Sequence, residues 1–135
     1  VELLRHFGVR VHWVGNDLHI RANELHTCAA PYALVSKMRA SFVALGALLG
    51  RCGEARMPMP GGCAFGPRPV DRHIKAFKAL GAEVLEEDGD FVVRRRGPLA
   101  GTVTFEAPTV GGTHNVILAA VLGRETATGW ASRGE

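Results

Sequence analysis

Residues 60–71 read PGGCAFGPRPVD, and this stretch decides the fold. It holds three glycines and three prolines, which exclude a helix or a central strand because proline removes backbone donors and glycine weakens both structures. The stretch is therefore predicted to be a shaped loop. Pro69 suits the first turn of a helix over residues 70–80, and Gly81 is the expected end of that helix.

The same loop carries a thiol and a guanidinium, Cys63 and Arg68, directly before the predicted helix. A nearby cation and a helix N-terminus both favour bound anions and the thiolate form of cysteine. One interpretation is an anion site that contains a nucleophile or an acid. The alternative is a surface loop whose cysteine is only a small apolar residue. The loop by itself leaves both open.

Composition narrows the class of protein. The chain has 135 residues, of which 47% are hydrophobic, and a net charge of +3, as expected for one domain or part of one with a real core. The basic run at residues 94–96 follows a strand-like segment and is interpreted as a solvated strand end. With one Tyr and two Trp, a nucleic-acid platform is not expected.

Cysteine usage and hydropathy predict a cytoplasmic protein. Three cysteines without CxxC spacing indicate a reducing compartment and predict neither a disulfide framework nor a zinc site. No signal peptide is visible, and no apolar run reaches membrane-spanning length. The chain begins with Val rather than Met, inside a predicted helix over residues 1–7, so a missing N-terminal part is expected.

Two units of similar pattern follow each other at an offset of 73 residues. Matching pairs are Gly8 with Gly81, Val11 with Val84, Asp17 with Asp90, Arg21 with Arg94 and Leu45 with Leu118. Each unit is predicted as helix, strand hairpin, strand, buried helix and strand, with a first-unit strand around residues 24–28. The buried helices are expected over residues 36–50 and 113–122, because both are almost entirely apolar or small after their first residues. Repeated units bury each other's faces, so an α/β repeat fold is predicted.

Two further positions suggest anion binding. Arg39 lies near the N-terminal end of the first buried helix, where the macrodipole disfavours a cation unless an anion is close. An exposed first turn is the alternative. A glycine-bearing linker over residues 107–113 leads into the second buried helix, and its backbone N–H groups suit a phosphate. A plain connecting loop is the alternative there.

Together these motifs resemble the UDP-N-acetylglucosamine 1-carboxyvinyltransferase family, within the EPSP synthase superfamily of enolpyruvyl transferases. The stretches that carry the resemblance are residues 60–73, 28–35 (CAAPYALV), 38–41 (MRAS) and 110–113 (VGGT). The resemblance implies an inside-out α/β fold of βαβαββ units with buried central helices. It makes residues 1–127 part of the first domain, with units at about 1–54 and 55–127, and residues 128–135 a divergent or disordered tail.

The resemblance also implies a reaction. Enolpyruvate would pass from phosphoenolpyruvate to the 3′-hydroxyl of UDP-N-acetylglucosamine with release of phosphate, the first committed step of peptidoglycan synthesis and so of cell wall growth, cell shape and division. No cofactor or metal is implied, and neither nucleic acid nor a membrane is an expected partner. Cys63 would be the active-site cysteine, a general acid toward C3 of phosphoenolpyruvate or the site of a covalent adduct, and the target of fosfomycin. The implied substrate-binding residues are Arg39, Arg68, Pro69, Val70, Asp71, Thr109, Val110 and Gly111.

The chain also departs from the family pattern. The family's N-terminal Lys-Asn pair and its aspartate base fall outside this chain, Ala107 replaces a lysine, and residues 129–132 do not match. The chain by itself is therefore expected to be inactive, because half of the cleft is absent. A non-catalytic nucleotide-sugar-binding or structural module is the second hypothesis. A cysteine hydrolase that pairs Cys63 with His73 is the third, and the sequence offers it no orienting Asn or Asp.

Overall fold

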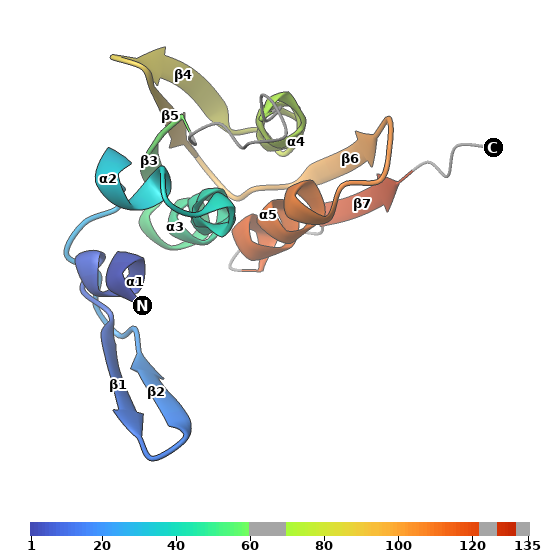
Figure 1. Ribbon diagram of the computed structural model, residues 1–135. Coiled ribbons are helices and arrows are strands. Elements are labelled where there is room, and N and C mark those ends of the chain that lie inside the picture. Colours follow the sequence, from blue (N-terminus) through green and yellow to red (C-terminus); the bar gives the residue numbers. More distant parts are fainter. Residues whose placement is uncertain (60–69, 122–126, 132–135) are drawn as a thin grey trace.

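The computed structural model describes residues 1–59, 70–121 and 127–131. Helices and strands are mixed along the chain, as predicted for an α/β fold (Figure 1). The elements in order are α1 (Glu2–His6), β1 (Arg10–Val14), β2 (Asp17–Arg21), α2 (Tyr32–Val35), the 3₁₀ helix η1 (Arg39–Val43), α3 (Ala44–Cys52), β3 (Glu54–Pro58), α4 (Asp71–Ala79), β4 (Glu83–Glu87), β5 (Asp90–Arg94), β6 (Gly101–Phe105), α5 (Val110–Ala120) and β7 (Ala127–Ala131). None of the helices within those ranges is long and apolar enough to cross a bilayer.

The predicted repeat is visible in the order of the elements. Strands β1, β2 and β3 recur 73 residues later as β4, β5 and β7. Both hairpins turn where the sequence predicts, and in the second hairpin Asp88 and Gly89 both have positive φ, as a type I′ turn requires. β3 of the first unit joins the second hairpin in a sheet of order β3-β5-β4, so the two units share a sheet.

The strand predicted around residues 24–28 is wrong. This segment forms only an isolated parallel bridge, between Ala29 and Arg56. The hydroxyl of Thr27 accepts the N–H of Ala29 at 3.2 Å, and such a local bond takes the place of a ladder partner. The corresponding pair of the second unit, β6 and β7, is a full parallel ladder.

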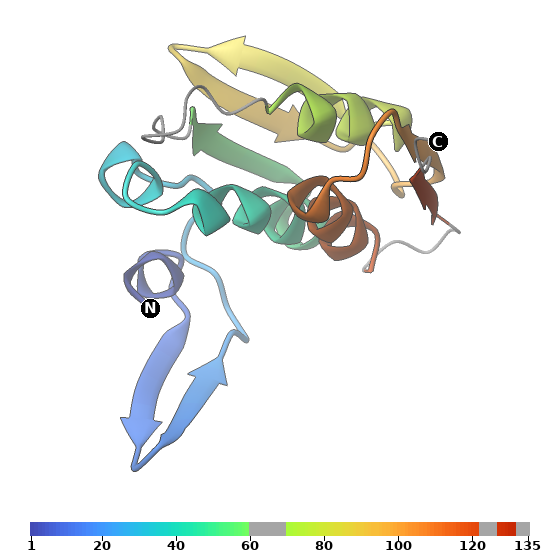
Figure 2. The same cartoon turned by 45° about the vertical axis from the view of Figure 1, so that its right-hand side comes forward.

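The helices α3 and α5 lie side by side in the middle of the molecule (Figures 1 and 2). Gly46 and Gly50 of α3 face α5 closely, since a Cβ on Gly50 would lie 3.0 Å from the carbonyl oxygen of Ala119. Glycine at both positions therefore permits this close approach. The largest fully buried side chains around this pair include Leu45, Leu49, Met57, Phe77 and Leu80.

Both buried helices differ in extent from their predictions. Met38 is extended (φ −145°, ψ 121°), so the first one does not run over residues 36–50 but begins at Arg39 as η1 and continues as α3 to Cys52. The second begins at Val110 instead of Thr113, because the side chain of Thr109 caps it. α3 is buried on most sides as predicted, but Ile117 of α5 and Val121, directly after it, remain 55% and 70% exposed, because the described elements that contact α5 cover only part of it.

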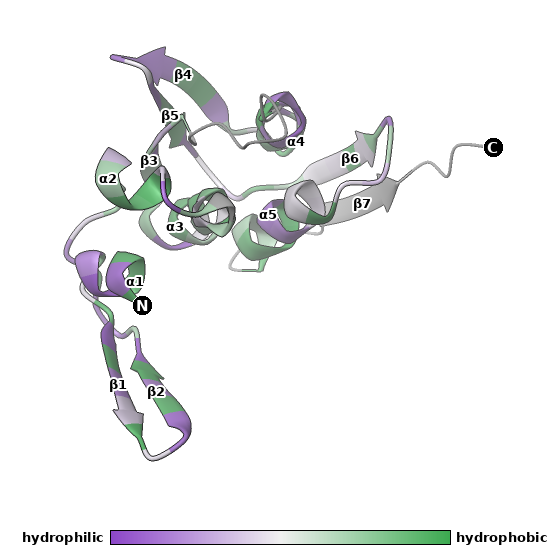
Figure 3. Ribbon diagram, viewed as in Figure 1, coloured by the Kyte–Doolittle hydropathy of each residue, from purple (hydrophilic) through white to green (hydrophobic). Residues whose placement is uncertain are grey.

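The hairpin of β1 and β2 extends away from the rest of the molecule, and apolar and polar residues alternate along it (Figure 3). Arg51, near the end of α3, donates hydrogen bonds to the carbonyl oxygens of Ala22 and Asn23, directly after β2. These bonds attach the base of the hairpin to α3. The structure also joins Cys28 to Cys52 by a disulfide, so the expectation that the cysteines form none is wrong. The packing of this segment against the end of α3 brings the two Cα atoms to 6.5 Å, within bridging range, although the residues are 24 apart in sequence.

The basic run at residues 94–96 stands at the end of β5, as predicted, and pairs with neighbouring acids. Arg94 donates to Glu54 at 2.8 Å and Arg96 to Glu83 at 3.2 Å. The hydrogen bond to Glu54 raises the pKa of Arg94 above its ordinary value. Arg56 makes a similar bond to Asp90 at 2.7 Å. The pairs Arg94–Glu54 and Arg56–Asp90 connect β5 with β3 at the surface of the sheet.

Candidate substrate-binding site

The predicted site residues divide into those that the structure describes and those that it does not. Cys63, Arg68 and Pro69 lie outside the described residues. The backbone of Arg39 begins η1, as predicted for a cation near a helix start, but its side chain is likewise outside the described part. The remaining predicted residues stand at the starts of α4 and α5.

The start of α5 is built by Thr109. Its backbone is extended (φ −143°, ψ 110°), and its Oγ1 accepts the N–H of Gly112 at 3.2 Å, which satisfies one donor of the first turn. Gly112 is required at this point, because a Cβ there would lie 2.7 Å from Cγ2 of Thr109. Val110 is 75% exposed, so the first turn, with the positive end of the helix macrodipole, lies at the surface.

We expect the substitution Thr109→Ala to lower the free energy of unfolding by about 1 kcal/mol, because it removes the capping oxygen. Thr109→Ser is the matched control, since it keeps the hydroxyl and should lose less than half as much. Urea unfolding followed by circular dichroism measures both. Equal stability of the alanine and serine variants would contradict the capping role.

The start of α4 carries Val70 and Asp71. Val70 is half-buried against the core, and Asp71 is exposed in the first turn, where a carboxylate is favourable against the helix macrodipole. His73 follows within the same turn and points toward the two other segments. The first turn of α4 therefore connects the undescribed loop at residues 60–69 to the helical core.

Three of the predicted segments meet at His73. Its Nδ1 lies 2.8 Å from Nδ2 of Asn115 in α5, and its ring packs edge-to-face on Phe42 of η1 with the ring centroids 5.1 Å apart. A Cβ on Gly111 would lie 3.3 Å from Cε1 of His73, so the outer edge of the ring covers the first turn of α5. The structure thus brings together η1, which begins at Arg39, the helix that follows the cysteine loop, and the predicted phosphate-binding turn.

Sequence reasoning missed the role of Asn115 in this arrangement. Asn115 is fully buried, and its Oδ1 accepts the N–H of Gly46 at 2.9 Å while its Nδ2 donates to the carbonyl oxygen of Phe42 at 3.1 Å. A polar side chain inside an almost wholly apolar helix is the signal that points to such a role. The statement that the sequence offers His73 no orienting Asn is therefore wrong.

The chain as a whole resembles known proteins. The sequence profile of EPSP synthase (3-phosphoshikimate 1-carboxyvinyltransferase) matches residues 1–132, nearly the whole chain. The chain belongs to the EPSP synthase family. The predicted resemblance to this superfamily is thereby confirmed.

Close relatives within the EPSP synthase family share one name, UDP-N-acetylglucosamine 1-carboxyvinyltransferase. The protein of Deinococcus radiodurans is 59% identical over 129 residues, which are 95% of this chain and 30% of that protein. That of Deinococcus deserti is 60% identical over 124 residues, 91% of this chain and 29% of that protein. That of Thermus thermophilus is 58% identical over 125 residues, 93% of this chain and 29% of that protein. The chain thus spans 29–30% of the length of these relatives.

Solved structures agree on the fold. The enolpyruvyl transferase NikO from Streptomyces tendae matches 90% of this chain with 28% of its own, at a TM-score of 0.65 and 20% identity. EPSP synthase from Acinetobacter baumannii matches 90% of this chain with 29% of its own, at a TM-score of 0.61 and 17% identity. The predicted α/β fold of the EPSP synthase family is confirmed, and this chain forms part of such a domain.

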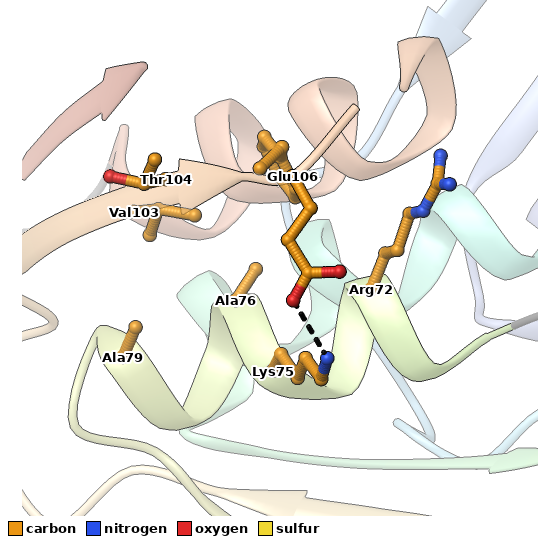
Figure 4. A pocket seen from close by; sticks show the side chains of 8 residues that line it. Arg72, Lys75, Ala76, Ala79, Val103, Thr104 and Glu106 are labelled. Carbon is orange, nitrogen blue, oxygen red and sulfur yellow. Dashed lines mark hydrogen bonds and ion pairs between the residues drawn. The ribbon is translucent and has the colours of Figure 1, made fainter. Parts of the chain in front are cut away.

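The structure also has a pocket that lies apart from the place where η1, α4 and α5 meet at His73. It is an open hollow of about 200 Å³ between α4 and β6 (Figure 4). Lys75 and Glu106 form an ion pair across it at 3.2 Å, and both side chains are mostly exposed. None of the predicted site residues lines it. In the described ranges, no three His, Cys, Asp or Glu side chains are grouped closely enough to hold a metal ion.

Proposed function

We propose that this chain is the cysteine-bearing part of an enolpyruvyl transferase that acts on UDP-N-acetylglucosamine. The complete enzyme transfers enolpyruvate from phosphoenolpyruvate to the 3′-hydroxyl of the sugar and releases phosphate, a committed step toward peptidoglycan and so toward cell wall growth and division. One observation carries the proposal. The three elements that begin at the motif residues converge on His73: η1 contacts its ring through Phe42, and α5 contacts it through Gly111 and Asn115, while His73 itself belongs to α4.

The described geometry supports anion binding at the start of α5. Thr109 caps the helix, Val110 of the first turn is exposed, and the macrodipole adds a positive end that attracts phosphate. We assign the diphosphate of the nucleotide sugar to Thr109, Val110 and Gly111. Val70 and Asp71, at the start of the neighbouring helix, are assigned to the uracil and ribose, together with Pro69.

The reacting groups are assigned to the cysteine loop and η1. Arg68 binds the phosphoenolpyruvate anion, because a guanidinium forms paired hydrogen bonds with carboxylate and phosphate oxygens, and Arg39 lines the same substrate cleft. Cys63 either protonates C3 of phosphoenolpyruvate as the neutral thiol or adds covalently to phosphoenolpyruvate as the thiolate. The cation at Arg68 and the N-terminus of α4 both favour the thiolate, which brings the two forms closer to balance near neutral pH. Residues 1–127 form part of the first domain of the enzyme, with units at about 1–54 and 55–127, and the chain by itself is inactive because the opposite wall of the cleft belongs to the rest of the enzyme.

The test is a chimera in which this chain replaces the matching segment of the Deinococcus radiodurans protein, to which it is 59% identical. We expect the chimera to release phosphate only when phosphoenolpyruvate and UDP-N-acetylglucosamine are both present, and we expect no turnover from the 135-residue chain alone. A chimera that folds and binds the nucleotide sugar in calorimetry, but neither releases phosphate nor is alkylated by fosfomycin, would identify a non-catalytic binding module instead. Turnover by the chain alone would overturn the assignment of the opposite wall.

A further inference from the structure

The side-chain amide of Asn115 is held in one orientation by the backbone. The N–H of Gly46 can only donate, and it lies 2.9 Å from Oδ1. The carbonyl oxygen of Phe42 can only accept, and it lies 3.1 Å from Nδ2. If the amide oxygen and nitrogen exchanged places, the N–H of Gly46 would face another donor and the carbonyl oxygen of Phe42 would face another acceptor. Two buried hydrogen bonds would be lost, at a cost of several kcal/mol. The two backbone groups therefore fix the orientation of the amide.

This orientation decides which nitrogen of His73 carries the proton. Nδ2 of Asn115 has two hydrogens, one for Phe42 and one for the ring of His73, whose Nδ1 lies 2.8 Å away. Nδ1 must accept that hydrogen, so it cannot carry a proton of its own. The proton of the neutral imidazole is then on Nε2, which acts as a donor.

We infer that Asn115 is a positioning residue that holds His73 as the Nε2–H tautomer at the start of α5. A Cβ on Gly111 would lie 3.5 Å from Nε2, so this nitrogen stands beside the first turn of the helix. The edge-to-face contact with Phe42, at 5.1 Å between centroids, fixes the plane of the ring. The inference rests on the proposed function in one respect, namely that the anion received beside Nε2 is the diphosphate of the nucleotide sugar.

The tautomer also separates two chemical roles of His73. A ring whose Nδ1 accepts from Asn115 and whose Nε2 carries the proton has no lone pair left to take a proton from a thiol. His73 therefore serves as a hydrogen-bond donor to an anion and not as the general base that a cysteine hydrolase requires. Gly46 and Phe42 supply the backbone groups on which this selection depends.

The first test is nuclear magnetic resonance of the whole chain labelled with ¹⁵N-histidine, in which long-range ¹H–¹⁵N spectra report the protonation of each ring nitrogen. The His73→Gln variant identifies the His73 signals among the six histidines. We expect an unprotonated Nδ1 and a protonated Nε2 at neutral pH. The opposite tautomer, or a doubly protonated ring, would overturn the inference. This measurement needs no variant of Asn115 and no substrate.

The second test replaces the donor by an acceptor of the same size. Asn115→Asp keeps an acceptor for Gly46 but offers a carboxylate oxygen to Nδ1, so Nδ1 should gain a proton, with or without loss of the proton on Nε2. The histidine spectra of the variant report both nitrogens. Where Nε2 has lost its proton, we expect the KM of the chimera for UDP-N-acetylglucosamine to rise about tenfold or more, the loss typical of one hydrogen bond to a charged group. In a His73→Gln background the same substitution should leave KM unchanged. An equal rise in both backgrounds would show a merely structural role and overturn the inference.

The two proposals fail in different ways. A wrong tautomer in the substrate-free spectra overturns the role of Asn115 and leaves the enolpyruvyl transfer intact. A chimera that shows the expected tautomer but releases no phosphate overturns the proposed function and leaves the tautomer assignment intact. If Asn115→Asp does not fold, the spectra of the unaltered chain still decide the inference.

Discussion

The substitution Gly46→Ala is expected to lower the free energy of unfolding by about 2 kcal/mol or more. A Cβ at this position would lie 2.8 Å from Oδ1 of Asn115 and against the backbone of α5, so α3 and α5 would have to separate. Overpacking of this kind costs about 1–3 kcal/mol, and the displaced amide of Asn115 loses hydrogen bonds worth about 1 kcal/mol each. Alanine regains less than about 1 kcal/mol of helix propensity, so the loss prevails.

Two other glycines serve as controls for this prediction. A Cβ on Gly97 would meet nothing within 4 Å, so Gly97→Ala should change the free energy of unfolding by less than about 0.5 kcal/mol. Gly50→Ala should lie between the two, because its Cβ would stand 3.0 Å from the carbonyl oxygen of Ala119. Urea unfolding of the three variants gives the order. If Gly46→Ala were as stable as Gly97→Ala, the close packing of α3 on α5 would be contradicted.

Local patterns in the sequence were sufficient for the hairpins and for the repeat. Alternation and turn residues are signals carried by neighbouring positions, so β1, β2, β4 and β5 could be predicted with their turns. The wrong prediction of a strand around residues 24–28 also has a local cause. The hydroxyl of Thr27 accepts a backbone N–H that a strand would use, and an alternating pattern of residues does not show this competition. The later start of the first apolar helix, at Arg39 instead of Ser36, depends on the extended backbone of Met38, which hydropathy does not encode.

Long-range contacts were beyond the reach of the sequence patterns. Asn115 and His73 are 42 residues apart, and Cys28 and Cys52 are 24 apart, so neither spacing marks them as partners. Asn115 and His73 meet because α5 packs on α3 and α4 packs on α5, and the two cysteines meet because Arg51 binds the base of the first hairpin to the end of α3. The resemblance to a known family therefore predicted the separate segments of the candidate site. Asn115, which connects these segments, could be recognised only from the fold.

Loss of the cysteine is the second large effect that we expect. In the chimera, Cys63→Ala should lower kcat by about 10²- to 10⁴-fold, the contribution typical of a positioned general acid. The thiol is assigned to the reacting carbon of phosphoenolpyruvate, whereas Cys28 and Cys52 are paired with each other at the base of the hairpin. Cys52→Ser is therefore the matched control. It should retain kcat, because it removes a sulfur that has no part in the proposed chemistry.

The most direct measurement of the proposed role of the cysteine loop is the rate of phosphate release by the chimera and its two cysteine variants at saturating phosphoenolpyruvate and UDP-N-acetylglucosamine. We expect Cys63→Ala to fall by at least about 10²-fold in kcat while Cys52→Ser stays close to the unaltered chimera. Turnover by Cys63→Ala at the rate of the unaltered chimera would show that the loop at residues 60–71 does not supply the reacting group, and would contradict the proposed function at its centre.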